Sequence, residues 1–388
     1  MRIVQVNSSL IKKDSISNVI LASHKVFAEA GFDSKIIVDT ISEYSGEFVY
    51  PLFLVESIHI TLFTIIEKAI SFENRMRLAK AYIRNMMHHK KARLIFDDAD
   101  VRIWHNSGFL LSDYLIHKND IFFFHNYTFS YLRDKFNGPN ELKLRVRLQA
   151  YNDLDLTYIC PSQYNINSLD KLNINYKSVY KLPLFHRYAL PYAARQQGAP
   201  QLLAWGRYAK NKAVPELVKT ASESRLNLTY FGDNNTLKEH REEYLKAKAY
   251  SNDKIRLLGQ IDNFEGELGK ANIYICNSYY EGFNLPLIEA EAHSLPVLAR
   301  RGTAMDELVR DGYNGYLFSD IDEVPELIEK IMSNYKRMSR NAWQHSQGFT
   351  YEIFKKRYLN ILSEYKKGHS VSAVGSQHKA MGHSGAKG

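Results

Sequence analysis

Short apolar runs alternate with helical hydrophobic periodicity in the first part of the chain. Met1 to Val6 is apolar, residues 18–30 repeat apolar side chains at helical spacing up to Gly31, and residues 35–38 are apolar again. This order predicts a βαβ unit, whose crossover makes the two strands parallel. The pattern continues in three further short runs, at residues 101–104, 121–124 and 156–159.

Polar groups follow each of these three later runs. In open α/β sheets, ligands bind outside the carboxyl ends of the strands. We therefore expect these groups to line one crevice: His105-Asn106, His125-Asn126-Tyr127 and Pro161-Ser162-Gln163.

A second series of apolar runs begins after a polar stretch with two prolines, residues 187–200. The series predicts a second doubly wound sheet. A last helix is expected near residues 351–365, and the rest lacks apolar periodicity, which is typical of a disordered tail. The runs of the second series are residues 202–205, 226–231, 255–258, 273–276 and 297–299.

Together these patterns predict an α/β protein with two Rossmann-like, doubly wound domains that face a cleft. The C-terminal helix is free to pack back on the first domain. The expected divisions are an N-terminal domain at 1–186, a linker at 187–200, a C-terminal domain at 201–348, a helix at 349–367 and a disordered tail at 368–388.

Composition narrows the class of protein. Of 388 residues, 45% are hydrophobic and 24% charged, which excludes a disordered or collagen-like chain. The net charge of +9 is compatible with nucleic acid, an anionic membrane or phosphorylated small molecules as partners. Two cysteines far apart predict neither a disulfide framework nor a Cys-rich metal site. No cleavable signal is expected at the start, so we expect a cytoplasmic protein.

The densest polar chemistry lies in residues 271–318, where a buried strand runs into a loop and a helix. Glu281 falls on the loop and Glu289 one turn into the helix. A helix N-terminus holds phosphate well, and carboxylates near it can accept hydrogen bonds from sugar hydroxyls. The main-chain N–H groups expected at the same end belong to Phe283, Asn284 and Leu285.

This segment resembles the Glu-x7-Glu signature of retaining GT-B glycosyltransferases of family 4, here Glu281-GFNLPLI-Glu289. Upstream, residues 202–221 resemble the family's strand-GR-x4-K loop, and Gly232 and Gly259 fall where the family has tight turns. The order agrees across residues 201–318 and more loosely to Leu362. The donor-binding set implied by the resemblance is Gly206, Arg207, Lys212, Gly259, Gln260, Glu281, Gly282, Phe283, Asn284, Leu285 and Glu289.

The resemblance implies a reaction without a metal or other cofactor, with a nucleotide-diphosphate sugar as donor. Arg207, Lys212 and the helix N-terminus would stabilise the leaving pyrophosphate. Glu289 would bind ribose hydroxyls and Glu281 hydroxyls of the transferred sugar, with retention by front-face attack and no enzyme nucleophile. The two Asp-x-Asp triplets, residues 98–100 and 153–155, are expected on the surface rather than at a metal.

Two histidines compete for the family position that faces the sugar. His125 matches in context and is assigned, with Glu281, to the catalytic set, while His105 ends the preceding strand. A structural hydrogen-bonding histidine is the alternative for both.

The chain also departs from the family pattern. Asn284 and Ser294 replace usual glycines, so the local backbone is expected to differ slightly. Glu291 stands where Met is common, and we expect it on a solvated helix face. The N-terminal loop lacks the family's Gly-Gly pair, and whether Ser8, Ser9 or a serine within 15–17 substitutes for it stays open.

Residues 75–93 hold seven basic and no acidic side chains, interleaved with apolar ones. Such a helix can lie on an anionic membrane, or it can pack its apolar side in the core and remain solvated. No nucleic-acid module accompanies the charge, so nucleic acid is not expected as a partner.

We therefore predict a hexosyltransferase (EC 2.4) that moves sugar to a glycan or lipid-linked acceptor, in the setting of bacterial lipopolysaccharide or other surface polysaccharide synthesis. It would be cytoplasmic or peripheral at the inner face of the membrane. The alternatives are a GT-B epimerase, a phosphorylase with pyridoxal phosphate, or a non-catalytic protein that binds sugar nucleotides. A hydride-transferring Rossmann enzyme is disfavoured because no G-x-G-x-x-G opens the first helix.

Overall fold

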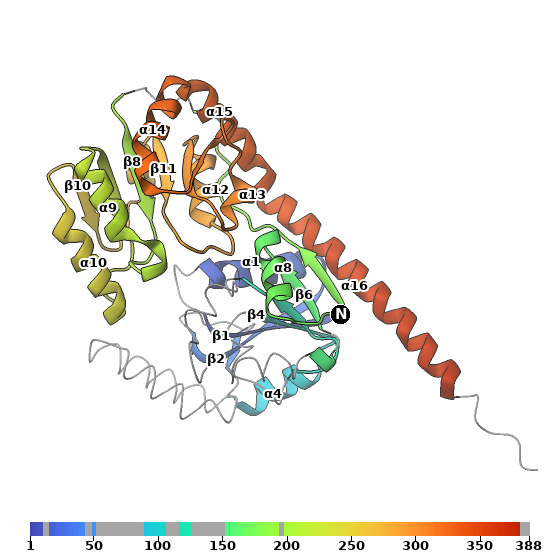
Figure 1. Ribbon diagram of the computed structural model, residues 1–388. Helices are drawn as coiled ribbons and strands as arrows, with labels where there is room; N and C mark the ends of the chain where they lie inside the picture. Colours follow the sequence, from blue (N-terminus) through green and yellow to red (C-terminus); the bar gives the residue numbers. More distant parts are fainter. Residues whose placement is uncertain are drawn as a thin grey trace, which may run out of the picture.

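The computed structural model describes residues 1–10, 15–42, 49–51, 89–105, 116–125, 152–154, 156–193 and 198–380. These residues form two parallel β-sheets, one in each of two domains (Figure 1). The predicted fold class, an α/β protein of two doubly wound domains, is confirmed.

The N-terminal sheet has the order β3-β2-β1-β4-β5-β6-β7, so the strand order reverses between β1 and β4. All its neighbouring strands are parallel. The strands are β1 (Arg2–Leu10), β2 (Asp33–Ser42), β3 (Val49–Pro51), β4 (Val101–His105), β5 (Ile121–Phe123), β6 (Thr157–Cys160) and β7 (Ser178–Lys181), with helices α1 (Ser15–Glu29), α4 (His89–Asp97) and α8 (Gln163–Lys171) and the 3-10 turn η1 (Asn152–Leu154).

The C-terminal sheet has the order β10-β9-β8-β11-β12-β13, with its reversal between β8 and β11. Its strands are β8 (Gln201–Trp205), β9 (Asn227–Phe231), β10 (Ile255–Leu258), β11 (Ile273–Cys276), β12 (Val297–Arg300) and β13 (Gly315–Phe318). The helices are α9 (Val214–Glu223), α10 (Lys238–Tyr250), α11 (Phe264–Lys270), α12 (Leu285–Ala292), α13 (Met305–Leu308), α14 (Val324–Ser333), α15 (Tyr335–Ser346) and α16 (Tyr351–Ala380), with 3-10 turns η2 (Lys210–Lys212), η3 (Ile321–Glu323) and η4 (Gln347–Phe349).

The chain crosses between the domains twice, and the two crossings lie against each other. The main-chain N–H of His186 donates to the carbonyl of Phe349 at 2.9 Å, and Nε2 of His186 contacts the carbonyl of Ser346, also at 2.9 Å. His186 is buried. These hydrogen bonds join the two crossings to each other at the connection between the domains.

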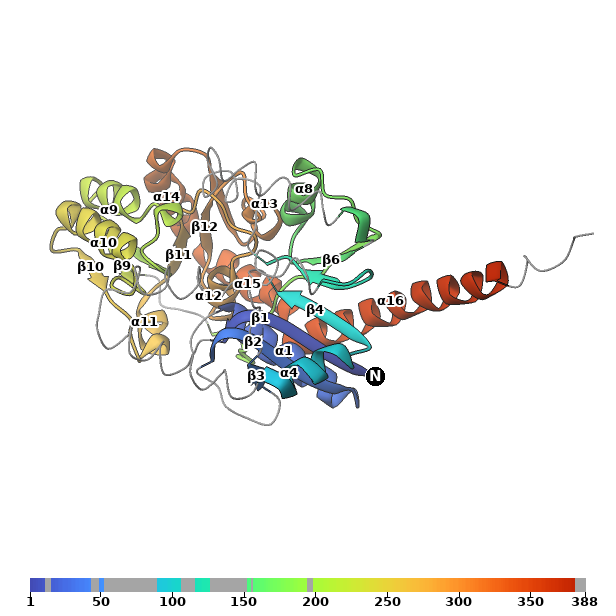
Figure 2. The ribbon, with the colours of Figure 1, turned by 90° about the horizontal axis from the view of Figure 1, so that it is seen from below.

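Helix α16 returns along the N-terminal domain (Figures 1 and 2). The ring of Tyr358 packs edge-on against Phe27 of α1 and Phe123 of β5, at centroid distances of 5.0 and 6.0 Å. Farther along, the hydroxyl of Tyr365 donates to the carbonyl of Asn119 at 2.5 Å. The part of α16 up to Tyr365 therefore packs in the core of the first domain.

The end of α16 differs from the sequence prediction. We expected a disordered tail from residue 368, but the helix extends to Ala380. Residues 351–380 contain no proline, and a helix already nucleated by packing propagates readily. Residues 381–388 lie outside the described residues.

None of the helices within the described ranges combines the length and the apolar character needed to cross a bilayer. Most of the basic segment, residues 75–88, lies outside the described residues, and its last part begins α4. Both alternatives for this segment, a helix on an anionic membrane and a solvated helix packed on the core, therefore stay predictions.

Candidate active site

Lys212 and Glu281 form an ion pair at the carboxyl edge of the C-terminal sheet. Lys212 closes the η2 turn after β8, and Glu281 lies on the loop after β11. Their side chains are 19% and 11% exposed, so the pair is largely, but not fully, shielded from bulk water. A phosphate that reached this point would compete with Glu281 for the Lys212 ammonium group.

Three glycines bring neighbouring strand ends close together beside this pair. Gly206 and Gly232 follow β8 and β9 with φ of +145° and +151°, and a Cβ on Gly232 would lie 1.8 Å from the carbonyl oxygen of Gly206. The N–H of Gly232 donates to the carbonyl of Gly259 at 3.1 Å. The predicted turns are therefore adjacent. Arg207 and Gln260, which follow directly, are both exposed.

The residues at the start of α12 are mostly structural. The side chain of Asn284 caps the helix by accepting from the N–H of Leu287 at 2.9 Å, and it is itself buried. Its φ of −121° is ordinary extended backbone, so no glycine is required there. Phe283 is buried in the hydrophobic core. A donor could therefore contact these residues only through the main chain.

Glu289 lies on α12, where its carboxyl group is largely removed from water. Burial raises the pKa of its carboxyl group to about 7, the Arg187 guanidinium lowers it, and the Glu265 carboxylate raises it further. Arg187 comes from the crossing between the domains, and its Nη2 lies 3.9 Å from Oε1 of Glu265. No motif in the sequence places Arg187 or Glu265 near Glu289.

His105 and His125 stack at the ends of β4 and β5 and are joined by a hydrogen bond. Nδ1 of His105 lies 2.8 Å from Nε2 of His125, and Nε2 of His105 lies 3.2 Å from Oε1 of Gln5 on β1. Burial lowers the pKa of His125 to about 3 and the pKa of His105 well below its ordinary value. Both imidazoles are therefore neutral at physiological pH. Each acts through one N–H donor and one nitrogen acceptor and carries no positive charge.

The two domains touch at Gly282, next to Glu281. A Cβ on Gly282 would lie 2.4 Å from the carbonyl oxygen of His125. The hydroxyl of Ser162, after β6, donates to the carbonyl of Gly282 at 2.7 Å. The contact therefore brings the main chain of His125 close to Glu281. The choice of His125 over His105 as the histidine that faces the sugar stays a prediction.

The prediction that Glu291 lies on a solvated helix face is wrong. Its side chain is fully buried, its Oε2 lies 2.7 Å from Nδ1 of His345 on α15, and it accepts a hydrogen bond from Asn314. The 3.6-residue period of α12 points this position toward α15, which only the tertiary fold supplies. Glu291 therefore joins the two helices.

Ser294 lies in a backbone conformation that favours glycine. Its φ is +64°, in the left-handed region. The serine side chain is therefore held in a strained conformation at this turn.

The first Asp-x-Asp triplet lies on the surface, as expected. Arg2 forms ion pairs with Asp98 and Asp100, whose side chains are 66% and 47% exposed. Asp153 lies in η1, and Asp155 lies outside the described residues. Ser8 and Ser9 lie at the end of β1 and Ser15 begins α1, but the structure assigns none of them to the donor.

Comparisons with known proteins agree with this arrangement. Residues 199–336 match the family of glycosyl transferases group 1. The chain is 34% identical to a probable sucrose-phosphate synthase of Thermosipho melanesiensis over 93 residues, 24% of this chain and 22% of the relative. It is 27% identical to an uncharacterised glycosyltransferase of Methanocaldococcus jannaschii over 206 residues, 50% of this chain and 55% of the relative.

A third relative is the alpha-monoglucosyldiacylglycerol synthase of Acholeplasma laidlawii, 27% identical over 177 residues, which are 42% of this chain and 44% of the relative. The matched part thus spans between about a fifth and about half of the length of these curated relatives.

Solved structures cover nearly the whole chain. Sucrose-phosphate synthase from Thermosynechococcus elongatus superposes with a TM-score of 0.67 at 16% identity, covering 95% of this chain and 99% of the other. HepE of Anabaena in complex with UDP-glucose gives 0.67 at 13% identity, covering 94% and 100%. At such low identity these likenesses show the fold.

The two parallel, doubly wound sheets and the solved structures that share them place the chain in the GT-B fold class of α/β proteins. Within that class, residues 199–336 match the family of glycosyl transferases group 1.

Proposed function

We propose that this protein is a retaining glycosyltransferase that moves a sugar from a nucleotide-diphosphate sugar to a glycan or lipid-linked acceptor. One observation carries the proposal. Lys212 and Glu281 pair at the carboxyl edge of the C-terminal sheet, next to the Gly282 contact with the N-terminal domain, and Glu289 lies on the helix α12 that follows the same loop.

The leaving group determines what the charged residues must do. Breaking the bond between the anomeric carbon and the donor oxygen leaves a nucleoside diphosphate whose negative charge grows in the transition state. Lys212, Arg207 on the same turn, and the N-terminus of α12 lie where they can stabilise that charge. These groups supply the stabilisation without a metal ion.

The Lys212–Glu281 pair suits an exchange of partners. Before the donor binds, each charge neutralises the other. When the pyrophosphate takes Lys212, the Glu281 carboxylate becomes available to accept hydrogen bonds from hydroxyls of the transferred sugar. His125, whose imidazole is neutral and whose carbonyl oxygen lies beside Gly282, would approach the sugar from the other domain.

Glu289 would bind the ribose hydroxyls of the nucleoside. A carboxylate accepts such hydrogen bonds strongly only when it is ionised, and its pKa of about 7 leaves it partly protonated near neutral pH. Arg187 lies close enough to favour the ionised form. Donor binding therefore favours pH values above 7.

The acceptor would bind to the N-terminal domain, which completes the site opposite the donor. A bacterial surface glycan, such as lipopolysaccharide, or its lipid-linked precursor is the acceptor class that we propose. The relative named alpha-monoglucosyldiacylglycerol synthase and the similar structure of the lipopolysaccharide outer core galactosyltransferase WaaB support this choice. A protein with such acceptors would act in the cytoplasm or at the inner face of the membrane.

The test compares transfer by the wild type with transfer by Glu289→Ala and Arg207→Ala. We expect both variants to fold and to lose transfer from a nucleotide sugar. Glu326→Ala is the matched control, because Glu326 is an exposed glutamate on α14 with only a surface ion pair. Retention predicts that the new glycosidic bond keeps the anomeric configuration of the donor, which NMR of the product reads directly.

Near-normal transfer by either variant would contradict the site. Conversion of the donor sugar in the absence of any acceptor would instead indicate an epimerase, and donor binding without turnover on any acceptor would indicate a non-catalytic protein.

A further inference from the structure

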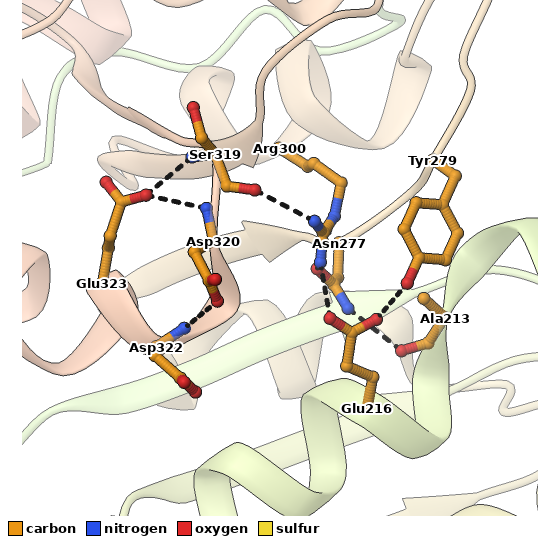
Figure 3. A network of polar contacts seen from close by, with 9 residues as sticks. All are labelled: Ala213, Glu216, Asn277, Tyr279, Arg300, Ser319, Asp320, Asp322 and Glu323. Carbon is orange, nitrogen blue, oxygen red and sulfur yellow. Dashed lines mark hydrogen bonds and ion pairs between the residues drawn. The ribbon is translucent and has the colours of Figure 1, made fainter.

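Arg300, the last residue of β12, organises a polar cluster beside the proposed donor residues (Figure 3). Its Nη2 donates to Oε1 of Glu216 and to Oδ1 of Asn277, both at 2.7 Å. Its Nη1 donates to the carbonyl of Ser319 at 3.2 Å. The Arg300 side chain is only 12% exposed, so its guanidinium group is largely shielded from water.

Tyr279 extends the cluster into the loop that carries Glu281. The Arg300 guanidinium carbon lies 4.7 Å from the centroid of the Tyr279 ring, and the Tyr279 hydroxyl donates to Oε2 of Glu216 at 2.6 Å. Tyr279 is otherwise 53% exposed. An exposed ring stacked on arginine and tied to a carboxylate holds its loop in place.

The same loop is joined to the turn that carries Lys212. The N–H of Tyr279 donates to the carbonyl of Asn211 at 2.8 Å, and Nδ2 of Asn211 donates to the carbonyl of Tyr280 at 3.4 Å. Nδ2 of Asn277 donates to the carbonyl of Ala213 at 3.1 Å (Figure 3). Lys212 lies between two residues held in this way, and Glu281 follows Tyr280 directly.

The turn needs such support. Ala213 adopts φ 47°, ψ 42°, the left-handed conformation that a residue with a Cβ rarely adopts. Strained backbone of this kind persists when surrounding contacts hold it. Asn277 supplies one such contact, and Arg300 fixes the orientation of Asn277.

We propose that Arg300, acting through Glu216, Asn277 and Tyr279, is a positioning residue that holds the Lys212 turn and the Glu281 loop in register for the donor. The effect of Arg300 on catalysis rests on the proposed function. Arg300 and its partners would act on the site by holding Lys212 and Glu281 in place, not by binding the donor themselves. Lysine cannot replace Arg300, because the several directed hydrogen bonds need the planar fork of a guanidinium group.

The first arm of the test needs no substrate. Hydrogen–deuterium exchange in Arg300→Met is expected to rise by about tenfold or more for amides in residues 210–213 and 277–281. The matched control is Arg102→Met, since Arg102 is also a shielded arginine, 15% exposed, paired with Asp120 at 2.9 Å in the other domain. In the control, exchange in these two segments should stay as in the wild type.

The second arm measures turnover with a UDP-, GDP- or ADP-sugar that the wild type uses. Lys212 and Glu281 act on charge that develops in the transition state, so Arg300→Met should lower kcat about tenfold or more and change the donor KM by less than about threefold. Tyr279→Phe removes only one hydroxyl and should give a smaller loss. Glu216→Gln should retain more activity than Glu216→Ala, because the amide still offers an oxygen to Arg300.

Each outcome decides one question. Unchanged exchange in residues 210–213 and 277–281 of Arg300→Met overturns the positioning role, and so does an unchanged kcat in a variant of an active wild type. If the wild type uses no nucleotide sugar while exchange rises as expected, the proposed function is wrong and the holding role of Arg300 stands.

Discussion

Among the residues proposed to bind the donor, Glu289 is the one whose pKa the fold shifts strongly. Burial raises the pKa of its carboxyl from 4.5 to about 7, so the folded protein holds this proton more tightly than the unfolded chain does. Stability from this group is thus present below pH 4.5 and is lost as the pH rises through 7.

The variant Glu289→Gln isolates this effect, because glutamine does not titrate. We expect the variant to gain stability relative to the wild type as the pH rises from 4.5 to 8, by up to about 3 kcal/mol. Urea unfolding of both proteins at several pH values measures the difference. A difference that does not change with pH would contradict the raised pKa.

Ser294 offers a second prediction at this scale. Its left-handed φ of +64° is strained, and its buried hydroxyl oxygen has no hydrogen-bond partner among the described residues. Ser294→Gly removes both costs and should stabilise the protein by about 1 kcal/mol, read as a higher midpoint of thermal unfolding. Ser294→Ala keeps the strained backbone and should recover only part of that gain. A lower midpoint for Ser294→Gly would contradict this account.

The sequence predicted some site residues and missed others for a physical reason. Lys212, Glu281 and Glu289 are identified by motifs that resemble those of a known family, and the structure pairs Lys212 with Glu281 and places Glu289 on the helix that follows. Arg187 and Arg300 are not, because the groups that give them a role lie far away in sequence: Arg187 acts on a carboxylate in another element, and Arg300 on Glu216, 84 residues distant.

At the scale of elements, α12 and α15 are joined by buried polar groups. Glu291 accepts from Asn314 and pairs with His345, and burial raises the pKa of its carboxyl. Glu291→Ala would leave Asn314 and His345 without this acceptor, so we expect a loss of about 2–4 kcal/mol in unfolding free energy.

Chemical denaturation measures this loss. Glu291→Gln, which keeps an acceptor oxygen, should cost clearly less. Equal stability of Glu291→Ala and the wild type would show that the buried network contributes nothing. Because Glu291 is two residues from Glu289, the same variant is expected to weaken donor binding.

Most strands in the described part of the chain could be predicted from their apolar runs, including β10 and β11 to the residue. Three of these described strands could not: β3 and β7 are short edge strands, and β13 begins at Gly315. The side chains of β7 are only half-buried, so it carries no clear apolar run. A Cβ on Gly315 would lie 1.9 Å from the carbonyl oxygen of Val297, which explains a glycine within this strand.

At the scale of the whole molecule, the two domains are held together by the contacts of Gly282 and by an ion pair. Besides the contacts of Gly282 with Ser162 and His125, Nζ of Lys181 lies 3.1 Å from Oε2 of Glu307 on α13. No local pattern in the sequence predicts these contacts, because each joins residues more than a hundred positions apart.

Gly282→Ala tests the contact between the domains. The added Cβ would lie 2.4 Å from the His125 carbonyl oxygen, so the loop or the domains must move. We expect kcat to fall by about tenfold or more, since small displacements of reacting groups are costly. Steady-state kinetics measure this fall.

The control is Gly269→Ala on α11, where an added Cβ meets nothing within 4 Å. This variant should keep full activity. Equal activity of Gly282→Ala and Gly269→Ala would show that the domain contact plays no part in the reaction.

The central claim is that charges at the meeting point of the two domains drive transfer from a nucleotide sugar. Its most direct test is the rate at which nucleoside diphosphate is released from UDP-, GDP- and ADP-sugars, with acceptor present, by the wild type and by Lys212→Ala. The account predicts release from at least one donor by the wild type and about a hundredfold less by the folded variant. Equal rates for the two proteins, or release from no donor by the wild type, would contradict it.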